Sequence, residues 1–504
     1  VGNGTRDAKP AFDLKQSPIL ARPARPMPRD MFFQHYGVNP TIDARTDNTS
    51  TFSVDVDTAS YSIIRNLLNR GILPDPAAVR VEEFVNAFDY QYPPPGDEVL
   101  SLQAEAFPSP NRQGYHLLHL GIKARDVSRQ SRKPANLVFV VDVSGSMKKE
   151  RRLDTVKNAL SLLVDQLNAD DYVAIVAYND HAHTILPPTS GYHRRAILAA
   201  IQRLHSGGST NVEDGLDLGY DLANKYFAPG IINRLILCSD GVANVGNRDA
   251  TAILETVGQR ADDGITLTAV GVGMGNYNDV LLEQLAQHGN GNYAYIDTPE
   301  EAEKLFVDKL TSTLEVVAKD TKVQVEFDPV VIQRYRQLGY ENRAMSDAAF
   351  LDGRRDAGEM GAGHSVTALY EVKFREPVAA SQNFGMFRVS YKLPNGQQVR
   401  VLEHPLPRQI IRHSYAEAAS PTQLSLVAAA FAEKLRGAYW SRYYSYNDLL
   451  NLSWQLRSAF AANPEVQELH ALIERASSLD QRADRFEHDM PLAQSSFDRV
   501  PVLR

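Results

Sequence analysis

Short apolar segments alternate with amphipathic ones through the middle of this 504-residue chain, and this alternation limits the possible folds more than any other feature. The first apolar segment is 137–141, and the amphipathic segment 153–167 after it carries one apolar stripe at a period of 3.6 residues. Apolar strands separated by helices form mostly parallel sheets covered by helices on both faces. The later expected strands are 172–177, 235–238, 265–272 and 293–296, and the later expected helices are 192–204, 212–226, 250–261, 278–287 and 299–317. We therefore predict a doubly wound, Rossmann-like α/β domain over residues 134–318.

The segments on either side of this block have a different pattern. Residues 1–50 contain scattered prolines and no sustained apolar period, which predicts a flexible leader or tether. The pattern of residues 51–133 predicts a region of helices and strands. A β-rich domain is predicted for 319–415, and a helical region for 416–504. Because strands both precede and follow the α/β block, we expect the flanks to form one β-sandwich in which strands of 97–125 pair with those of 319–415.

The composition narrows the class of protein. Lys and Arg number 53 against 61 Asp and Glu, a net charge of -8, which disfavours nucleic acid as a partner. The single cysteine, Cys238, allows neither an intrachain disulfide nor a Cys-rich zinc site. The longest apolar runs fall short of the roughly 18 residues that a membrane helix needs, so no transmembrane segment is predicted. The chain starts at Val1, and a lipid anchor upstream of that residue is compatible with the leader.

Polar side chains follow three of the expected strands or loops of the α/β block. Asp142, Ser144 and Ser146 directly follow the first strand, Thr210 precedes a helix, and Asp240 follows the strand 235–238. Loops at the carboxyl ends of parallel strands converge at one edge of the sheet, where open α/β sheets bind ligands. Two carboxylates and three hydroxyls are hard oxygen ligands, which favour Mg²⁺, Mn²⁺ or Ca²⁺ over Zn²⁺ or copper. A divalent-cation site is therefore predicted, with Mg²⁺ as the first choice.

With these residues in place, segment 134–318 resembles a von Willebrand factor type A (vWA) domain with a complete metal-ion-dependent adhesion site (MIDAS). In that family the serines and the threonine contact the cation, and the aspartates act directly or through water. The resemblance implies that Ser144, Ser146, Thr210, Asp142 and Asp240 hold the ion in this way. It also implies a free coordination position for an Asp or Glu of a partner protein, and no catalytic residues.

Three further segments, 50–61, 274–279 and 361–370, resemble a bacterial family of type A proteins with a characteristic N-terminal region and a C-terminal region of uncharacterised role. This resemblance spans about 50–475. Members of that family are commonly exported or lipid-anchored, which implies a metal-dependent adhesion or scaffold protein of the cell envelope, in the periplasm or as a membrane-anchored lipoprotein. An assembly factor that cooperates with an AAA+ ATPase, a role of other bacterial type A proteins, is the alternative.

A second alternative comes from the Asp-x-Asp-x-Thr sequence of Asp55, Asp57 and Thr58, which resembles the nucleophile loop of haloacid-dehalogenase-type phosphatases. There the first aspartate attacks phosphorus and the second transfers protons. The segment after Thr58 lacks the strand–helix repetition of such a fold. We therefore favour a structural role, in which these residues cap the helix that begins near Tyr61.

Overall fold

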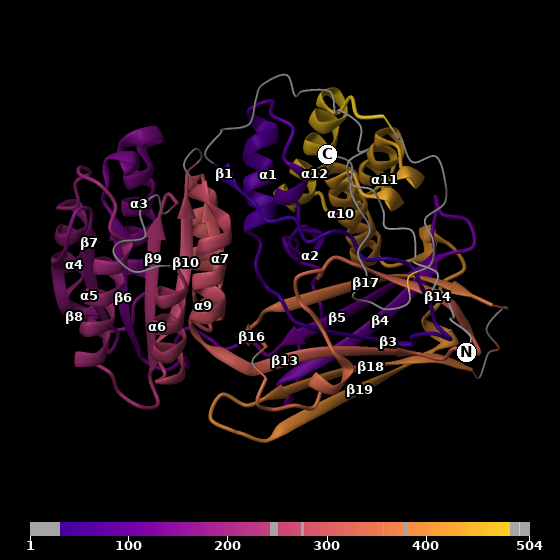
Figure 1. The fold of residues 1–504 in the computed structure, drawn as a ribbon, viewed down its shortest axis with the longest axis horizontal. Helices are drawn as coiled ribbons and strands as arrows, with labels where there is room; N and C mark the ends of the chain where they lie inside the picture. Colours follow the sequence, from indigo (N-terminus) through magenta and orange to yellow (C-terminus); the bar gives the residue numbers. More distant parts are fainter. Residues whose placement is uncertain are drawn as a thin grey trace, which may run out of the picture.

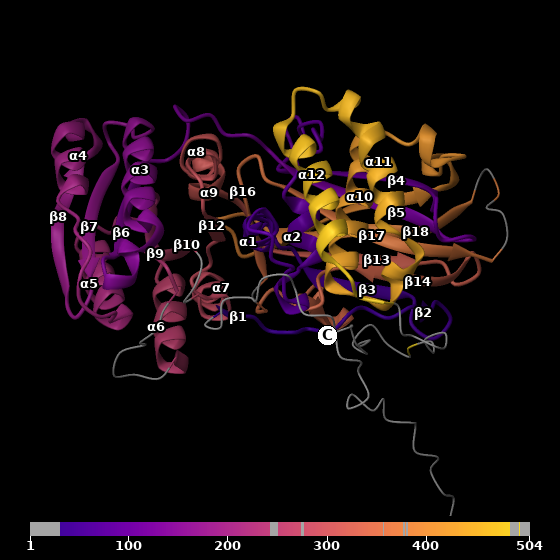
Figure 2. The ribbon, with the colours of Figure 1, turned by 90° about the horizontal axis from the view of Figure 1, so that it is seen from above.

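A computed structural model describes residues 31–483, apart from 242–249, 274–276, 356, 376–378, 380 and 381, and also describes Ala493. The α/β domain lies at one end of the molecule, and a β-sandwich with a layer of helices lies at the other (Figures 1 and 2). Within the described residues, no helix combines the length and the apolar composition needed to cross a bilayer.

The sheet of the α/β domain has the strand order β12-β10-β9-β6-β7-β8. Neighbouring strands are parallel except β8, which runs antiparallel to β7. The bounds are β6 (Ala135–Asp142), β7 (Tyr172–Tyr178), β8 (Ala182–Ser190), β9 (Ile232–Ser239), β10 (Thr266–Val272) and β12 (Tyr293–Ile296). The predicted doubly wound fold is confirmed. The edge strand β8 was not predicted, because its outer positions are exposed and two prolines interrupt its apolar pattern.

Helices cover both faces of this sheet because the side chains of its central strand are apolar on both faces. Leu137, Phe139 and Val141 of β6 face a core shared with two helices, α3 (Arg152–Asp165) and α4 (Arg194–Gln202). Val138 and Val140 face the opposite core, which includes residues of α5 (Val212–Lys225), α6 (Ala250–Asp262) and α7 (Asp279–His288). The central strand is thus buried along its whole length.

The last helix of the domain differs from the predicted 299–317. It is divided into α8 (Pro299–Glu303), a turn of π-helix, η5 (Lys304–Asp308), and α9 (Leu310–Leu314). The chain then continues directly into β13 (Val316–Phe327), because the β-branched pair Val316 and Val317 begins a strand that pairs with β16 (Gly358–Gly361). The prediction of a single helix to residue 317 was therefore wrong.

The sandwich consists of two antiparallel sheets. One has the order β15-β3-β13-β18-β19, with β16 also paired to β13, and the other has the order β2-β14-β17-β5-β4. Buried residues of both sheets form one apolar core. Its strands are β2 (Ile42–Asp43), β3 (Thr49–Ser53), β4 (Leu100–Pro108), β5 (His116–Ala124), β14 (Ile332–Leu338), β15 (Ala344–Met345), β17 (Ser365–Phe374), β18 (Asn383–Lys392) and β19 (Val399–Pro407). Strands from both sides of the α/β block thus share each sheet, as expected for an inserted domain.

A layer of helices covers the outer face of the second sheet (Figure 1). Outward-facing residues of that sheet, Phe107, Leu117 and Leu369, belong to the same core as the apolar residues of these helices. The helices are α1 (Ala59–Asn69), α2 (Val81–Asn86), α10 (Ser420–Arg436), α11 (Tyr446–Ala459) and α12 (Pro464–Leu479). Helices from the two ends of the chain thus form one layer, since α2 and α10 meet through the edge-to-face pair Phe84 and Phe431.

The flexible leader predicted for 1–50 does not hold for its second part. Residues 1–30 lie outside the described residues. Beyond them, β1 (Met31–Phe32) pairs with β11 (Tyr277–Asn278) of the α/β domain, and β2 pairs with β14 of the sandwich. Val38 and Ile42 are buried. Single apolar residues and very short strands hold this segment in place, and neither produces the sustained pattern on which the prediction relied.

Candidate metal centre

The carboxyl edge of the α/β sheet brings two of the predicted loops into direct contact. β6 ends at Asp142, and the chain turns there toward α3. The backbone N–H of Gly145 donates to the carbonyl of Gly208 over 3.0 Å, and the N–H of Gly207 donates to the carbonyl of Val143 over 2.7 Å. These two bonds hold the loop of Ser144 and Ser146 against the loop that precedes α5.

Four of the five predicted ligands form one hydrogen-bonded cluster. The hydroxyl oxygens of Ser144 and Ser146 lie 2.9 Å apart, and the Ser146 hydroxyl donates to Oδ1 of Asp240 over 3.0 Å. The backbone N–H of Ser144 donates to Oδ1 of Asp142 over 2.8 Å, and the Ser239 hydroxyl donates to its Oδ2 over 3.1 Å. Side chains almost a hundred residues apart in sequence thus meet at one point.

Thr210 is the fifth predicted ligand, and it lies in the adjoining loop. Its side chain makes no hydrogen bond with the other four residues within the part of the chain that is described, although the residue is buried at the same edge. The next residue, Asn211, caps α5 by accepting from the N–H of Asp214, and its own N–H donates to the carbonyl of Asn179. These contacts fix the backbone that carries Thr210, while its hydroxyl stays available.

The electrostatics of the cluster favour a cation. Asp142 is fully buried, and burial raises its pKa to about 6, with the nearby Asp240 carboxylate acting in the same direction. The hydrogen bonds from Ser144 and Ser239 oppose this rise. Gly145, between the two serines, is exposed and Ser146 is half-buried, so the cluster is open to solvent on that side.

Arg152, the first residue of α3, also belongs to the cluster and was not among the predicted site residues. Its Nη1 donates to Oδ2 of Asp240 over 2.5 Å, and its Nη2 lies 3.9 Å from Oε2 of Glu150. Glu150 in turn accepts from Arg70 at the end of α1 over 2.8 Å. Glu150 and Arg151 have φ values of 50° and 58°, and this kink turns Arg152 inward. The sequence does not indicate that two adjacent charged residues adopt the left-handed backbone conformation, which is uncommon for residues other than glycine.

The donor set fits a hard divalent ion. Among the described residues, no three His, Cys, Asp or Glu side chains come together as a metal-binding group. A site here therefore depends on hydroxyl oxygens beside its two carboxylates, which is the set that Mg²⁺ and Mn²⁺ accept and Zn²⁺ does not favour. Asp142 and Asp240 would hold the ion with Ser144, Ser146 and Thr210, and the carboxylates would offset part of its charge, because Asp240 is also paired with Arg152.

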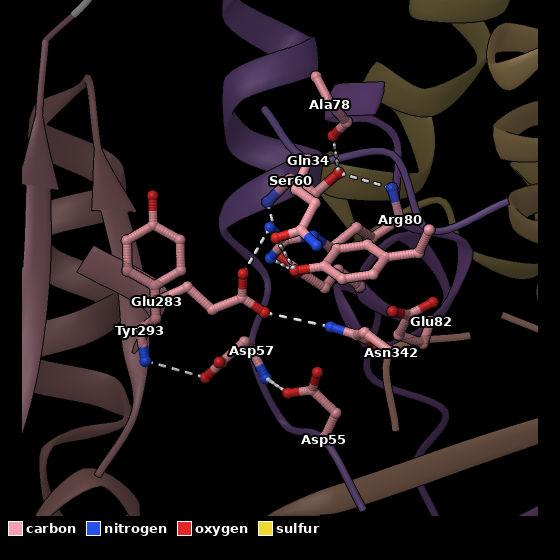
Figure 3. Close-up of polar contacts among 12 residues, drawn as sticks. Gln34, Asp55, Asp57, Ser60, Ala78, Arg80, Glu82, Glu283, Tyr293 and Asn342 are labelled. Carbon is pink, nitrogen blue, oxygen red and sulfur yellow. Dashed lines mark hydrogen bonds and ion pairs between the residues drawn. The ribbon is translucent and has the colours of Figure 1, made fainter. Parts of the chain in front are cut away.

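Asp55 and Asp57, the residues of the phosphatase alternative, lie where the sandwich meets the α/β domain. Figure 3 shows Asp57 between Asp55 and the backbone of Tyr293. The Tyr293 N–H donates to Oδ1 of Asp57 over 2.9 Å, and the Asp57 N–H donates to Oδ1 of Asp55 over 3.1 Å. Arg343 donates from Nε to Oδ2 of Asp55 over 3.0 Å. Both aspartates follow an antiparallel strand, β3, and not the parallel strand that a phosphatase loop requires.

The expected helix-capping role of these aspartates is also not observed. Thr58 precedes α1 and its side chain makes no capping hydrogen bond, and in the first turn the N–H of Ser60 donates to Oε2 of Glu83 over 2.7 Å. The carboxylates instead connect two parts of the molecule, because Tyr293 belongs to β12 while Asp55 and Asp57 directly follow β3. Burial, together with the charge of Asp55, raises the pKa of Asp57 well above its usual range.

The chain matches three protein families along its length. Residues 136–310 match the von Willebrand factor type A domain, residues 27–119 match a family described as von Willebrand factor, and residues 312–479 match the family described as "Uncharacterized protein YfbK, C-terminal". The three matches follow one another along the chain.

Similar proteins occur in bacteria and in mammals. The chain is 36% identical to Escherichia coli YfbK over 473 residues, which are 88% of this chain and 80% of that protein. It is 29% identical to inter-alpha-trypsin inhibitor heavy chain H2 of Mus musculus, over 34% of this chain and 19% of that protein. A solved structure of a von Willebrand factor type A protein from Catenulispora acidiphila is 17% identical, with a TM-score of 0.42, and the match covers 73% of this chain and 88% of that one.

Proposed function

Because the chain belongs to the family of von Willebrand factor type A proteins with a YfbK-type C-terminal region, we propose that it binds a partner protein through a divalent cation at the carboxyl edge of its α/β sheet. The observation that carries this proposal is the convergence of Asp142, Ser144, Ser146 and Asp240 into one hydrogen-bonded cluster. Mg²⁺ is the expected ion, and an Asp or Glu side chain of the partner is the expected ligand.

Each residue of the cluster has a distinct task in this proposal. Asp142 is buried and held by Ser144 and Ser239, so it presents a fixed negative charge at the base of the site. Ser146 lies at the half-buried rim, where the partner would approach. The bound cation would act as a Lewis acid toward the partner's carboxylate. Neutral hydroxyl ligands would leave the ion enough positive charge to attract that carboxylate, and we assign no catalytic step to the site.

Isothermal titration with Mn²⁺ and Mg²⁺ tests the metal centre directly. The wild-type chain, freed of metal on a chelating resin, is expected to bind one equivalent, and Asp142→Asn is expected to lose this binding while keeping its size and hydrogen-bonding shape. Asp154→Asn, a change at an exposed carboxylate of α3, serves as the matched control. Equal binding by the wild type and Asp142→Asn would contradict the assignment.

A second experiment tests the partner. The tagged full-length chain is used to capture proteins in Mg²⁺ and again in EDTA, with Asp142→Asn in Mg²⁺ as a parallel sample, and the captured proteins are identified by mass spectrometry. We expect a protein that the wild type captures in Mg²⁺ and that is absent from the other two samples. Replacing acidic residues of that protein should then abolish the interaction. Capture that is insensitive to both changes would contradict the proposal.

The phosphatase alternative is tested separately with an aryl phosphate. The contacts of Asp55 with Arg343 and of Asp57 with Tyr293 support a role in joining the two parts of the molecule. We therefore expect no hydrolysis above the level of the buffer. Hydrolysis that is lost in Asp55→Asn but kept in Asp142→Asn would favour the enzyme.

A further inference from the structure

A second candidate site lies between the α/β domain, the helical layer and the sandwich. A cavity of about 410 Å³ is lined by residues from all three parts. Tyr293 comes from β12, and Thr311 and Thr313 come from α9. His364 comes from the turn between β16 and β17, and Ser365 is the first residue of β17; both belong to the segment 361–370, which the candidate metal centre does not use.

The wall formed by this turn and by α9 is rich in hydrogen-bond donors. The N–H of Gly361 donates to Nδ1 of His364 over 3.1 Å, so the neutral imidazole carries its proton on Nε2. Within the described ranges, Nε2 has no hydrogen-bond partner, and the hydroxyls of Thr311, Thr313 and Ser365 have none either. These lining groups can therefore all donate to a bound molecule.

The same wall is positively charged. Lys123 and Lys309 both line the cavity, and Lys123 donates to the carbonyl of Gly363 over 2.6 Å, which holds it beside His364. Burial lowers the pKa of His364 to about 3, and the charged groups that lower it further are Lys309, Lys123 and Arg234. All three of these charged groups are cations.

Most of the acidic residues that line the cavity interact with a nearby cation or accept a backbone hydrogen bond. Asp126 lies 3.9 Å from Lys123, and Glu465 forms an ion pair with Lys304. Asp57 accepts from the Tyr293 backbone and faces Arg343 at 3.9 Å, and Asp89 lies at the exposed rim. Burial and the charge of Lys304 lower the pKa of Lys309 more than Glu465, Glu301 and Asp89 raise it, so an anion beside its ammonium group would be favourable.

We propose that this cavity binds a small molecule through an anionic oxygen group, a phosphoryl or a carboxylate, held by Lys123, Lys309 and His364. Hydroxyls of Thr311 and Thr313 add hydrogen bonds from the α/β domain. The volume suits a compact metabolite, because small-molecule sites commonly enclose about 300–1,000 Å³. Since α9 belongs to the α/β domain and His364 to the sandwich, the bound molecule would hold the two parts together.

Calorimetric titration of the full-length chain with inorganic phosphate, and separately with succinate, tests the proposal and distinguishes the two anion types. The protein is first freed of metal on a chelating resin, so that the metal centre cannot bind the anion. We expect saturable binding of at least one anion, weakened at least tenfold in Lys309→Met and in His364→Leu. The matched controls are Lys225→Met and His413→Leu, at exposed positions far from the cavity in sequence, and both should bind like the wild type.

Thr313→Val provides a variant of nearly unchanged shape, and it should weaken binding several-fold even if His364→Leu folds poorly. Absence of saturable binding with both anions would overturn the proposal, as would equal binding by the wild type and all three cavity variants. The outcome is independent of the metal centre, because Asp142→Asn should keep the anion affinity of the wild type.

Discussion

The guanidinium of Arg152 donates to Oδ2 of Asp240 over 2.5 Å, while Ser146 donates to Oδ1 of the same carboxylate over 3.0 Å. One of the two carboxylates of the candidate metal centre is therefore already paired with a buried cation. A divalent ion at this site must share Asp240 with Arg152, so the arginine lowers the charge that the site offers to the metal.

Arg152→Met should therefore bind Mn²⁺ more tightly than the wild type, by about threefold to tenfold, because Asp240 then carries its full charge toward the ion. The same variant should be less stable without metal, since Asp240 loses its buried partner. Titration calorimetry and metal-dependent thermal unfolding measure both effects. Arg151→Met, at an 85% exposed side chain, is the control. Weaker Mn²⁺ binding in Arg152→Met would mean that the arginine organises the site and does not compete with the ion.

Acid should destabilise the fold through buried neutral histidines. His119 is buried between the hydroxyls of Tyr92 and Ser425, at 2.6 and 2.8 Å, and burial lowers its pKa to about 4. The unfolded chain, with a histidine pKa near 6.5, binds this proton more tightly, so stability rises with pH from about 4 to 6.5 and is level above. His119→Gln should reduce this slope by at most about 1.4 kcal/mol per pH unit.

Urea unfolding at pH 5.0 and pH 7.5 measures the slope. His116 and His364 titrate in the same direction, with pKa values lowered to about 4 and about 3 by burial, so part of the dependence should remain in the variant. His413→Gln, at an exposed position, should unfold with the same pH dependence as the wild type. An unchanged slope in His119→Gln would contradict the prediction.

Two helical glycines should respond to alanine in opposite ways. A Cβ at Gly219 of α5 would lie 2.5 Å from Val140 and 2.8 Å from Leu235, so Gly219→Ala should destabilise the domain by about 1–3 kcal/mol through overpacking. Among the residues that the structure describes, a Cβ at Gly258 of α6 would meet only the carbonyl of His288, at 3.9 Å. Gly258→Ala should therefore stabilise by about 0.5–1 kcal/mol, because alanine favours the helix. Denaturant unfolding measures the free energy of unfolding of both variants. Equal changes in the two would show that helix propensity alone determines stability at these positions.

A buried ion-pair network should hold the helical layer to the sandwich. Arg336 of β14 donates to Glu371 of β17 over 2.8 Å and to Glu433 of α10 over 2.9 Å, with all three residues buried. Arg336→Met should cost about 3–5 kcal/mol, because it leaves carboxylates buried beside fewer cations. The comparison is Arg388→Met, which removes the more exposed pairs with Glu326 and Glu403 and should cost less than about 1 kcal/mol. Similar losses of unfolding free energy in both variants would contradict this account.

Much of the α/β domain could be predicted from sequence because its strands are buried on both faces. A continuous apolar run such as Leu137–Val141 can then be recognised as a strand without knowing which strands pair with it. The position of Asp142, Ser144 and Ser146 at the carboxyl edge of the sheet could be predicted for a related reason, because they adjoin that run. That they hold a cation remains a prediction.

Features that depend on distant contacts escaped prediction. The turn of Arg152 toward Asp240 depends on the positive φ values of Glu150 and Arg151, and the strand that begins at Val316 depends on its pairing with β16. The segment around Val38 holds its place through short pairings with strands more than two hundred residues away. A single apolar residue in such a segment carries no periodic signal.

The insertion of the α/β domain has a mechanical consequence. Its two connections to the sandwich leave from β5, which lies between β17 and β4, and from β13, which lies between β3 and β18. Each of these strands is hydrogen-bonded on both sides, and they belong to opposite sheets. A pulling force on the α/β domain would consequently be transmitted to both sheets through two interior strands. Because each of these strands is bonded on both sides, the force would shear many backbone hydrogen bonds together and would not break them one at a time from an edge.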